Sequence, residues 1–361
     1  MKGSILIVGG YGTVGQVAAT RLAERYPGQV IAAGRKYDKA NELSKATNRK
    51  ILPLAFDILV AHETPEILDD VALVIMSLDL PNTRFAEMCL QNGVDYVDVT
   101  ATYAYLAQVE ALNEVAQAGG GTAVLSVGIA PGLTNLLVSH AKSQYDDLQQ
   151  LDIHVLLGLG ETHGEAAVRW MVENLNRSFS VQENGKAKLV KNFGDGEQTV
   201  FPAKLGRRTT YRFDFSDQHV LPRTLGINTV STRIGFESAL ITDLIALAKK
   251  IGLFYLLRYQ RAQDVLVQLL RMLRLGTELF VAQVDAQGLA NGQRQTSSSA
   301  VSGDGEGRIT GLVAAQVAER LIEGNFQSGV FHIEQLFEPF PFIIGLEADG
   351  LRFHIRKAVN W

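Results

Sequence analysis

Four glycines lie within seven positions near the start of the chain, directly after an apolar run. Gly10, Gly12 and Gly15 fit the pattern G-x-G-x-x-G, and Gly9 begins a second frame, G-x-x-G-x-x-G. In such a turn one glycine permits a tight bend, another lets the backbone approach a pyrophosphate, and the third lets a helix pack closely on a strand. The stretch predicts a dinucleotide phosphate site, and the alternative is a glycine-rich turn without a ligand. The candidate contacts are Gly9, Gly10, Tyr11, Gly12, Thr13, Val14 and Gly15.

Two cations follow the second apolar run, in the sequence AAGRK. Arg35 comes twenty residues after Gly15, where sites for NAD usually carry an acidic residue that binds the ribose 2′-hydroxyl. A guanidinium can instead pair with a 2′-phosphate. We therefore expect Arg35 and Lys36 to select NADP(H), the alternative being two exposed surface cations beside bound NAD. Asp57 either closes the adenine pocket or only caps a helix.

Alternating strand and helix patterns over the first 130 residues must position these side chains. Strands followed by helices predict a parallel sheet covered on both faces, and right-handed crossovers make it a doubly wound Rossmann sheet. The expected strands are 4–9, 29–34, 50–56, 71–78, 95–100 and 122–128, and the expected helices are 13–26, 39–47, 82–93 and 104–120.

The pattern changes after Gly132, where several runs alternate in strand fashion. Asn291-Gly292 between two such runs is a strong hairpin signal. We expect a discontinuous α+β substrate and dimerisation domain with a mostly antiparallel sheet over 131–307, and a Rossmann domain over 1–130 and 308–345. The expected strands include 151–159, 186–193, 199–205, 209–215 and 228–236, and the expected helices are 165–177, 237–275 and 308–325.

Several segments together resemble the saccharopine dehydrogenase-like family of NADP-dependent oxidoreductases. They are VGGYGTVGQ, AAGR, LVIMSLDLPNTRFAEMCLQNGVDYVDVTA and SVGIAPGLTNLLV, followed by the closing segment TELFVAQVDAQGLANGQRQTSSSAVSGDGEGRITGLVAAQVAERLIEGNFQSGVF. The resemblance covers about residues 1–140 and 275–335, and the stretch between them, where substrate choice would reside, is not matched closely. It implies that the helix near 308–325 crosses back to the first domain.

The resemblance also implies that the reactive site lies beside the ends of the fourth and fifth strands. Loops beyond the carboxyl ends of parallel strands bind ligands in this fold. Ser77, Leu78 and Asp79 would then contact the cofactor, Thr100 the substrate, and Asp98 or Tyr103 would relay a proton. For each polar residue the alternative is a helix cap or a satisfied loop residue.

Substrate carboxylates would need cations from the second domain. Arg223 and Arg233 lie in less charged surroundings than the cluster Arg207, Arg208 and Arg212, so we expect them to bind the substrate. Glu161, His163 and Glu165 lie close together, but ligands packed into five residues without a distant partner better fit a loop at a helix start, so we expect no metal.

Composition narrows the class of protein. The chain has 361 residues and a net charge of −4, so no basic surplus points to nucleic acid. Cys89 is the only cysteine, which excludes an internal disulfide and a thiolate zinc site. With no signal-peptide pattern at the start, we expect a cytoplasmic protein, and we expect a homodimer.

Two questions stay open at this stage. The apolar and basic stretch 239–275 is expected to form a buried helix pair with a solvated basic rim, and the alternative is a helix that binds a membrane surface or a partner. The function is expected to be hydride transfer to or from a C=N bond (opine or imine type) or a C=C bond of a small molecule. The alternative is an NADP-binding regulator or scaffold without turnover.

Overall fold

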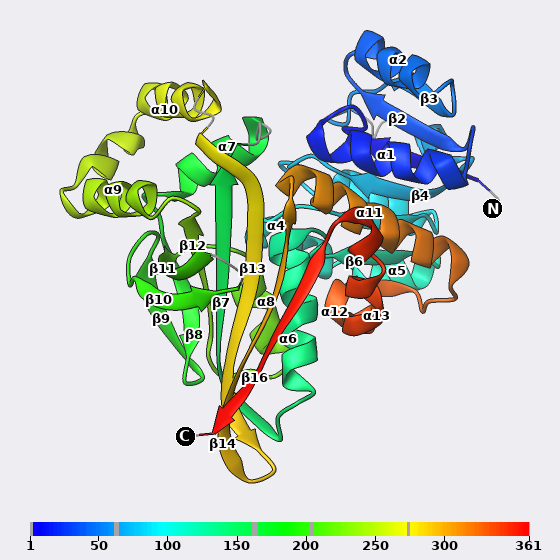
Figure 1. Ribbon diagram of the computed structural model, residues 1–361. Coiled ribbons are helices and arrows are strands. Elements are labelled where there is room, and N and C mark those ends of the chain that lie inside the picture. Colours follow the sequence, from blue (N-terminus) through cyan, green and yellow to red (C-terminus); the bar gives the residue numbers. More distant parts are fainter. Residues whose placement is uncertain (1–2, 61–64, 161–164, 203–204, 273–274, 361) are drawn as a thin grey trace. The chain divides into compact units, whose positions relative to one another are not determined.

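A computed structural model describes residues 3–60, 65–160, 165–202, 205–272 and 275–360. The chain divides into two compact units, each shown in Figure 1. Unit 1 comprises Met1–Gly128 and Gly307–Leu336, and unit 2 comprises Ile129–Glu306 and Phe337–Trp361. Residues 337–345, which we expected in the Rossmann domain, belong to unit 2. There the ring of Phe340 stacks on His140, with the ring centroids 6.3 Å apart.

Unit 1 is built on a seven-stranded sheet whose strands all pair in parallel, in the order β15-β6-β5-β4-β1-β2-β3. The central strands are buried on both faces, as their continuous apolar runs require. The fold therefore confirms the predicted Rossmann sheet. The strands are β1 (Ser4–Val8), β2 (Val30–Gly34), β3 (Ile51–Ala55), β4 (Val71–Met76), β5 (Asp95–Asp98), β6 (Thr122–Leu125) and β15 (Gly329–His332).

Helices cover this sheet, and the last of the long ones comes from the far end of the chain. Figure 1 shows this helix, α11, beside α1. A Cβ at Gly311 of α11 would lie 2.6 Å from the Val14 carbonyl oxygen of α1, so glycine permits the close packing of the two helices. Arg21 and Glu319 form an ion pair across the same contact, 3.2 Å apart. The helices are α1 (Thr13–Arg25), α2 (Tyr37–Ala46), α3 (Arg84–Gln91), α4 (Tyr103–Glu110), α5 (Asn113–Gly119), α11 (Glu306–Glu323) and α12 (Ile333–Leu336), so the single helix expected over 104–120 is in fact two.

Unit 2 contains a second seven-stranded sheet in the order β10-β11-β12-β7-β13-β14-β16. Only the pair β12–β7 is parallel, which confirms the predicted mostly antiparallel sheet. The predicted hairpin is also confirmed, because Ala290 pairs with Gln293 across a turn in which Asn291 and Gly292 have φ values of 52° and 73°. The strands are β7 (Asp147–Leu159), β10 (Glu197–Phe201), β11 (Gly206–Arg212), β12 (Val230–Phe236), β13 (Leu275–Ala290), β14 (Gln293–Asp304) and β16 (Arg352–Asn360), with β8 (Ser178–Glu183) and β9 (Lys186–Lys191) forming a separate pair.

The stretch expected as a buried helix pair forms three elements that are largely exposed. They are α9 (Ala239–Lys250), the 3-10 helix η5 (Leu253–Arg258) and α10 (Gln260–Met272). Most of their large apolar side chains face solvent, so the expectation of burial was wrong. None of the helices in the described ranges combines the length and apolar character needed to cross a bilayer. The other helices of unit 2 are α6 (Thr134–Lys142), α7 (Glu165–Asn174), α8 (Asp217–Thr224) and α13 (Pro339–Ile344).

Candidate functional site

The glycine turn between β1 and α1 leaves space that side chains would fill. A Cβ at Gly15 would lie 2.3 Å from the Gly9 carbonyl oxygen, and one at Gly10 would lie 2.7 Å from the Ala32 Cα. Gly12 is exposed, and its Cβ would meet only the Gly9 oxygen, at 3.1 Å. The turn itself therefore needs glycine at positions 10 and 15, whereas glycine at position 12 keeps the outer surface of the turn open.

The same turn presents uncapped N–H groups to that open surface. Gly12 precedes α1 and supplies no capping side chain, and the first turn of α1 holds no acidic residue. The first helical N–H groups, at Thr13 and Val14, lack acceptors within the helix, and the helix dipole adds partial positive charge there. This is the arrangement that binds a pyrophosphate, so the residues present fit a dinucleotide.

The neighbouring strand β4 brings a second loop to the turn. The chain runs from β1 outward to β3 and then returns to β4 on the other side of β1, which places the topological switch point between β1 and β4. The Ser77 hydroxyl and N–H both donate to the Val8 carbonyl oxygen, at 2.6 and 3.1 Å. Leu78 and Asp79 are exposed beyond it. The predicted cofactor residues Ser77, Leu78 and Asp79 thus lie beside the glycine turn.

The residues that follow β2 are tied to the glycine turn by Tyr11. Its hydroxyl accepts a hydrogen bond from the Lys36 N–H, at 3.0 Å, and its ring lies against Gly34, where a Cβ would be 2.6 Å from the ring. Arg35 and Lys36 are exposed. Arg35 forms no ion pair with any residue in the described ranges, so its charge is available to an external anion.

Asp57 follows β3 and caps its own turn. It is exposed, and its Oδ1 accepts from the Leu59 N–H at 3.1 Å. This contact corresponds to the capping alternative for Asp57. Contact with an adenine stays a prediction.

Asp98, at the end of β5, is fully buried. Its oxygens accept hydrogen bonds from the Tyr96 hydroxyl and the Thr100 N–H, both at 2.8 Å. Burial raises its pKa to about 6, and these hydrogen bonds oppose the rise. Burial also raises the pKa of Tyr96, whose hydroxyl lies 3.3 Å from that of Tyr105. Asp98 therefore holds the loop between β5 and α4 from inside, and Tyr103, which is half-buried, is the first residue of α4.

A buried Ser–His–Glu chain, which the sequence analysis missed, joins three elements of unit 1. Ser126 Oγ lies 2.8 Å from His332 Nδ1, and His332 Nε2 lies 2.6 Å from Glu110 Oε1. Ser126 is fully buried, so its hydroxyl cannot reach a substrate. The chain is a structural link between the end of β6, β15 and α4, and residues more than 200 positions apart offer no local sequence signal for it.

The two arginines predicted to bind substrate differ in their surroundings. The Arg233 side chain is 5% exposed and contacts Asp152 at 2.6 Å and Glu197 at 2.8 Å. Burial alone would raise the pKa of Asp152, but Arg233 and two hydrogen bonds outweigh it and hold that pKa below its ordinary value. The guanidinium that we expected to meet a substrate carboxylate is thus occupied by carboxylates of the protein. Arg223, in the last turn of α8, is exposed.

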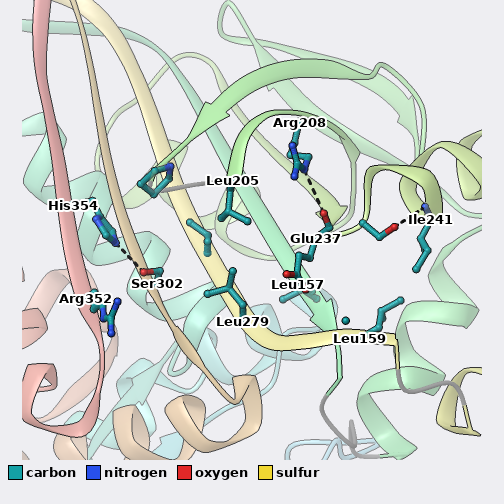
Figure 2. Close-up of a pocket in the computed structure, with 14 residues that line it drawn as sticks. Leu157, Leu159, Leu205, Arg208, Glu237, Ile241, Leu279, Ser302, Arg352 and His354 are labelled. Atoms are coloured by element: carbon teal, nitrogen blue, oxygen red, sulfur yellow. Dashed lines mark hydrogen bonds between the residues drawn. The ribbon is translucent and has the colours of Figure 1, made fainter.

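Unit 2 contains a cavity of about 750 Å³ that the sequence did not indicate. Figure 2 shows Leu205 and Leu279 lying between two polar groups, one with Arg208 and Glu237 and the other with Arg352 and His354. His354 Nε2 lies 2.8 Å from the Ser302 hydroxyl. Arg208 belongs to the cluster that we ranked below Arg223 and Arg233. The cavity suits a molecule with an apolar body and an anionic group.

Part of the acidic and histidine cluster that we weighed for a metal, Glu161 and His163, lies outside the described residues. Within the described ranges, no group of three His, Cys, Asp or Glu side chains is arranged to hold a metal ion.

Comparisons with known proteins agree with this geometry. Residues 5–124 match the family model described as saccharopine dehydrogenase NADP binding domain. The structure is similar to apo saccharopine dehydrogenase (L-Glu forming) from Saccharomyces cerevisiae, with a TM-score of 0.71 and 15% identity, over 98% of this chain and 100% of that chain. At this identity the similarity shows a shared fold.

Two further structures are more distant. The diaminopimelate (DAP) dehydrogenase of C. glutamicum in complex with DAP has a TM-score of 0.45 and 15% identity, over 96% of this chain and 99% of that chain. An engineered D-amino acid dehydrogenase bound to NADP+ has a TM-score of 0.46 and 14% identity, over 96% and 99%. The resemblance noted in the sequence is confirmed by the match of residues 5–124 to the model of the saccharopine dehydrogenase NADP binding domain, and the chain shares the fold of saccharopine dehydrogenase.

Proposed function

We propose that the protein is an NADP(H)-dependent oxidoreductase that acts on a C=N bond of opine or imine type, or on a C=C bond, in a small molecule. The observation that carries the proposal is the open glycine turn with uncapped N–H groups beside the exposed Arg35. NADP(H), when bound, supplies or accepts the hydride. Thr13 and Val14 would hold its pyrophosphate through their N–H groups, and Arg35 with Lys36 would hold its 2′-phosphate.

The proton that accompanies hydride transfer needs a donor at the same edge of the sheet. Asp98 is enclosed by Tyr96 and Thr100, so in this proposal it is a positioning residue and not a group that touches substrate. Tyr103, half-buried at the start of α4, is the proposed proton donor. Thr100, which we expected to contact the substrate, is 3% exposed and donates its N–H to Asp98, so it is not retained in that role.

Cations of unit 2 are proposed to bind an anionic part of the substrate. Arg223 is retained because it is exposed, and Arg233 is not, because it lies in an internal ion-pair network. The cavity with Arg208 and Arg352 is a further candidate for the same role. An amphipathic carboxylate would match both the apolar and the charged side chains that line this cavity.

The proposal is tested by mixing the purified protein and NADPH with a panel of imines and enoyl compounds and following the nicotinamide absorbance. We expect turnover of at least one class, loss of turnover in Gly12→Val, and a strongly reduced kcat in Tyr103→Phe. A higher KM without a change in kcat is expected for Arg223→Ala if this residue binds substrate. Tight NADP(H) binding with no turnover of any acceptor would instead favour a nucleotide-binding regulator or scaffold.

A further inference from the structure

Exposed apolar side chains are concentrated in one part of unit 2. Eleven of the twenty-one large hydrophobic side chains that are exposed in the described ranges fall within residues 240–272. Scattered exposed apolar residues are normal on a protein surface, whereas a contiguous group marks an interaction site. We call this group the docking face, and it consists of Leu240, Leu244, Leu247, Ile251, Leu253, Tyr255, Leu256, Tyr259, Val265, Leu269 and Met272.

Helical spacing places the exposed apolar side chains of α9 on one side of that helix. Leu240, Leu244, Leu247 and Ile251 recur at intervals of three or four residues along α9 and just beyond it, and their exposures lie between 52% and 70%. Residues at this spacing share one helix face. The inner side of α9 packs against β11 and β12, and no described residue of unit 2 covers its outer apolar side. Figure 1 shows α9 and α10 at the margin of unit 2.

The same segment repeats this pattern on α10, where Val265, Leu269 and Met272 are exposed by 65%, 51% and 82%. The inner side of α10 packs against α7. Between the two helices, η5 adds Tyr255 and Leu256, exposed by 60% and 50%. Three consecutive elements thus present apolar side chains to solvent.

Positive charge accompanies this apolar surface. Residues 239–272 contain five lysines and arginines and two carboxylates, in a chain whose net charge is −4. One of the two carboxylates, Asp264, is paired with Arg169 at 2.8 Å. The Arg258 guanidinium lies over the rings of Tyr255 and Tyr259, 4.0 and 4.5 Å from their centroids. Tyrosine and arginine beside exposed leucines are typical of segments that lie in the interface of a membrane.

The positive charge of the docking face distinguishes between two possible partners, a second copy of this chain and a membrane surface. In a symmetric dimer this face would pack against itself, so its excess of cations over carboxylates would face an equal excess on the second copy, which is unfavourable. An anionic lipid surface neutralises those cations and covers the apolar side chains at the same time. We propose that the docking face binds the surface of a membrane that contains anionic lipid, without crossing it.

Flotation of the full-length protein with vesicles tests the proposal. The wild type should float with vesicles of phosphatidylcholine and phosphatidylglycerol at a ratio of 70:30, and the bound fraction should fall at least tenfold with phosphatidylcholine alone. Leu244→Ser/Ile251→Ser/Leu256→Ser should lower the bound fraction at least tenfold, and so should Lys250→Gln/Arg258→Gln/Arg261→Gln. The matched control is Leu189→Ser/Ile355→Ser, which changes two apolar residues of unit 2 outside the docking face, exposed by 76% and 55%, and should float like the wild type.

Circular dichroism melting and NADP calorimetry on each variant distinguish a loss of folding from a specific loss of vesicle binding. Because neither measurement requires turnover, the result does not depend on the proposed catalytic function. The proposal would be overturned if the wild-type protein stayed at the bottom of the gradient. It would also be overturned if the control variant lost as much vesicle binding as the docking-face variants. Equal flotation on both vesicle types would remove the requirement for anionic lipid. If sedimentation shows a dimer that the leucine and isoleucine variant converts to a monomer, and neither form floats, the face is a contact between two copies.

Discussion

The hydroxyl of Tyr11 accepts a hydrogen bond from the backbone N–H of Lys36, and so one side chain of the glycine turn fixes the backbone that presents Arg35. The Tyr11 ring fits because position 34 is glycine, where any Cβ would lie 2.6 Å from it. The proposed phosphate site at the start of α1 and the proposed cofactor-selecting residues after β2 are therefore connected through Tyr11.

Tyr11→Phe should weaken NADP binding about fivefold, because it keeps the ring packing and removes one hydrogen bond, worth about 1 kcal/mol. Tyr37→Phe is the matched control, since Tyr37 is 50% exposed and follows the same loop. Calorimetric titration of both variants measures the effect. Equal affinities in the two variants would mean that the Tyr11 contact does not hold the loop.

Arg35→Ala should lower the affinity for NADP by a factor of about 10 to 150, equivalent to about 1.5–3 kcal/mol for a charge-assisted contact. The affinity for NAD should stay nearly constant, since NAD lacks the 2′-phosphate. Lys39→Ala, an exposed cation of α2, serves as the control. A parallel loss for NAD and NADP would show that Arg35 does not discriminate between them.

Gly12→Val and Gly15→Val should fail in different ways. The Gly12 site is open except for the Gly9 oxygen at 3.1 Å, so Gly12→Val should fold and lose nucleotide binding. The Gly15 site places a Cβ 2.3 Å from backbone, so Gly15→Val should also lower the melting temperature. Thermal melts and calorimetry distinguish the two, and nucleotide affinity retained in a folded Gly12→Val would remove the phosphate-site assignment.

Asp98→Asn should change how stability depends on pH. The pKa of Asp98 is raised to about 6 by burial, so the stability that its protonated form contributes is complete below its ordinary pKa and is lost as the pH rises through 6. Between pH 4 and 7 the variant should therefore gain up to about 3 kcal/mol relative to the wild type. Denaturant unfolding across that range measures this, with Asp38→Asn, a change at an exposed carboxylate, as the control. If the difference in unfolding free energy between Asp98→Asn and the wild type did not change with pH, the raised pKa of Asp98 would be contradicted.

Arg233→Ala should destabilise unit 2 by about 3–5 kcal/mol, because it leaves the buried Asp152 without its counter-charge. Arg223→Ala, on the exposed side of α8, should change stability by less than about 0.5 kcal/mol. Chemical denaturation of the two variants gives the comparison. Similar stabilities would show that the network around Arg233 contributes little.

Local sequence patterns predicted the fold of unit 1 well, because each pattern spans only a few residues and has a direct physical cause. Strand and helix periodicity gave the parallel sheet, and the glycine spacing located the turn that the structure places between β1 and α1. In unit 2 the Asn291-Gly292 hairpin was recognised, but an equivalent signal at Asn184-Gly185, which joins β8 to β9 with φ values of 52° and 71°, was overlooked together with β8.

The incorrect predictions concern contacts between residues that are distant in the sequence, which the local spacing of residue types does not encode. Arg233 resembled a substrate cation because its partners Asp152 and Glu197 are distant in sequence, and only the pairing of β12 with β7 brings Asp152 close. The stretch 239–275 was expected to form a buried helix pair because leucine-rich helices are usually buried, whereas burial depends on what else packs against them.

Because Gly311 packs against α1, unit 1 cannot complete its packing until the later part of the chain has been synthesised. Proteins grow from the N-terminus, so Val14 and Val17 leave the ribosome almost three hundred residues before the helix that covers them. Strand β15, which pairs with β6, arrives later still. A nascent chain therefore carries an incomplete nucleotide-binding unit while the whole segment 129–306 is being made, and exposed apolar surface of this kind is what chaperones bind. Val14 and Val17 are thus made early and reach their final packing late.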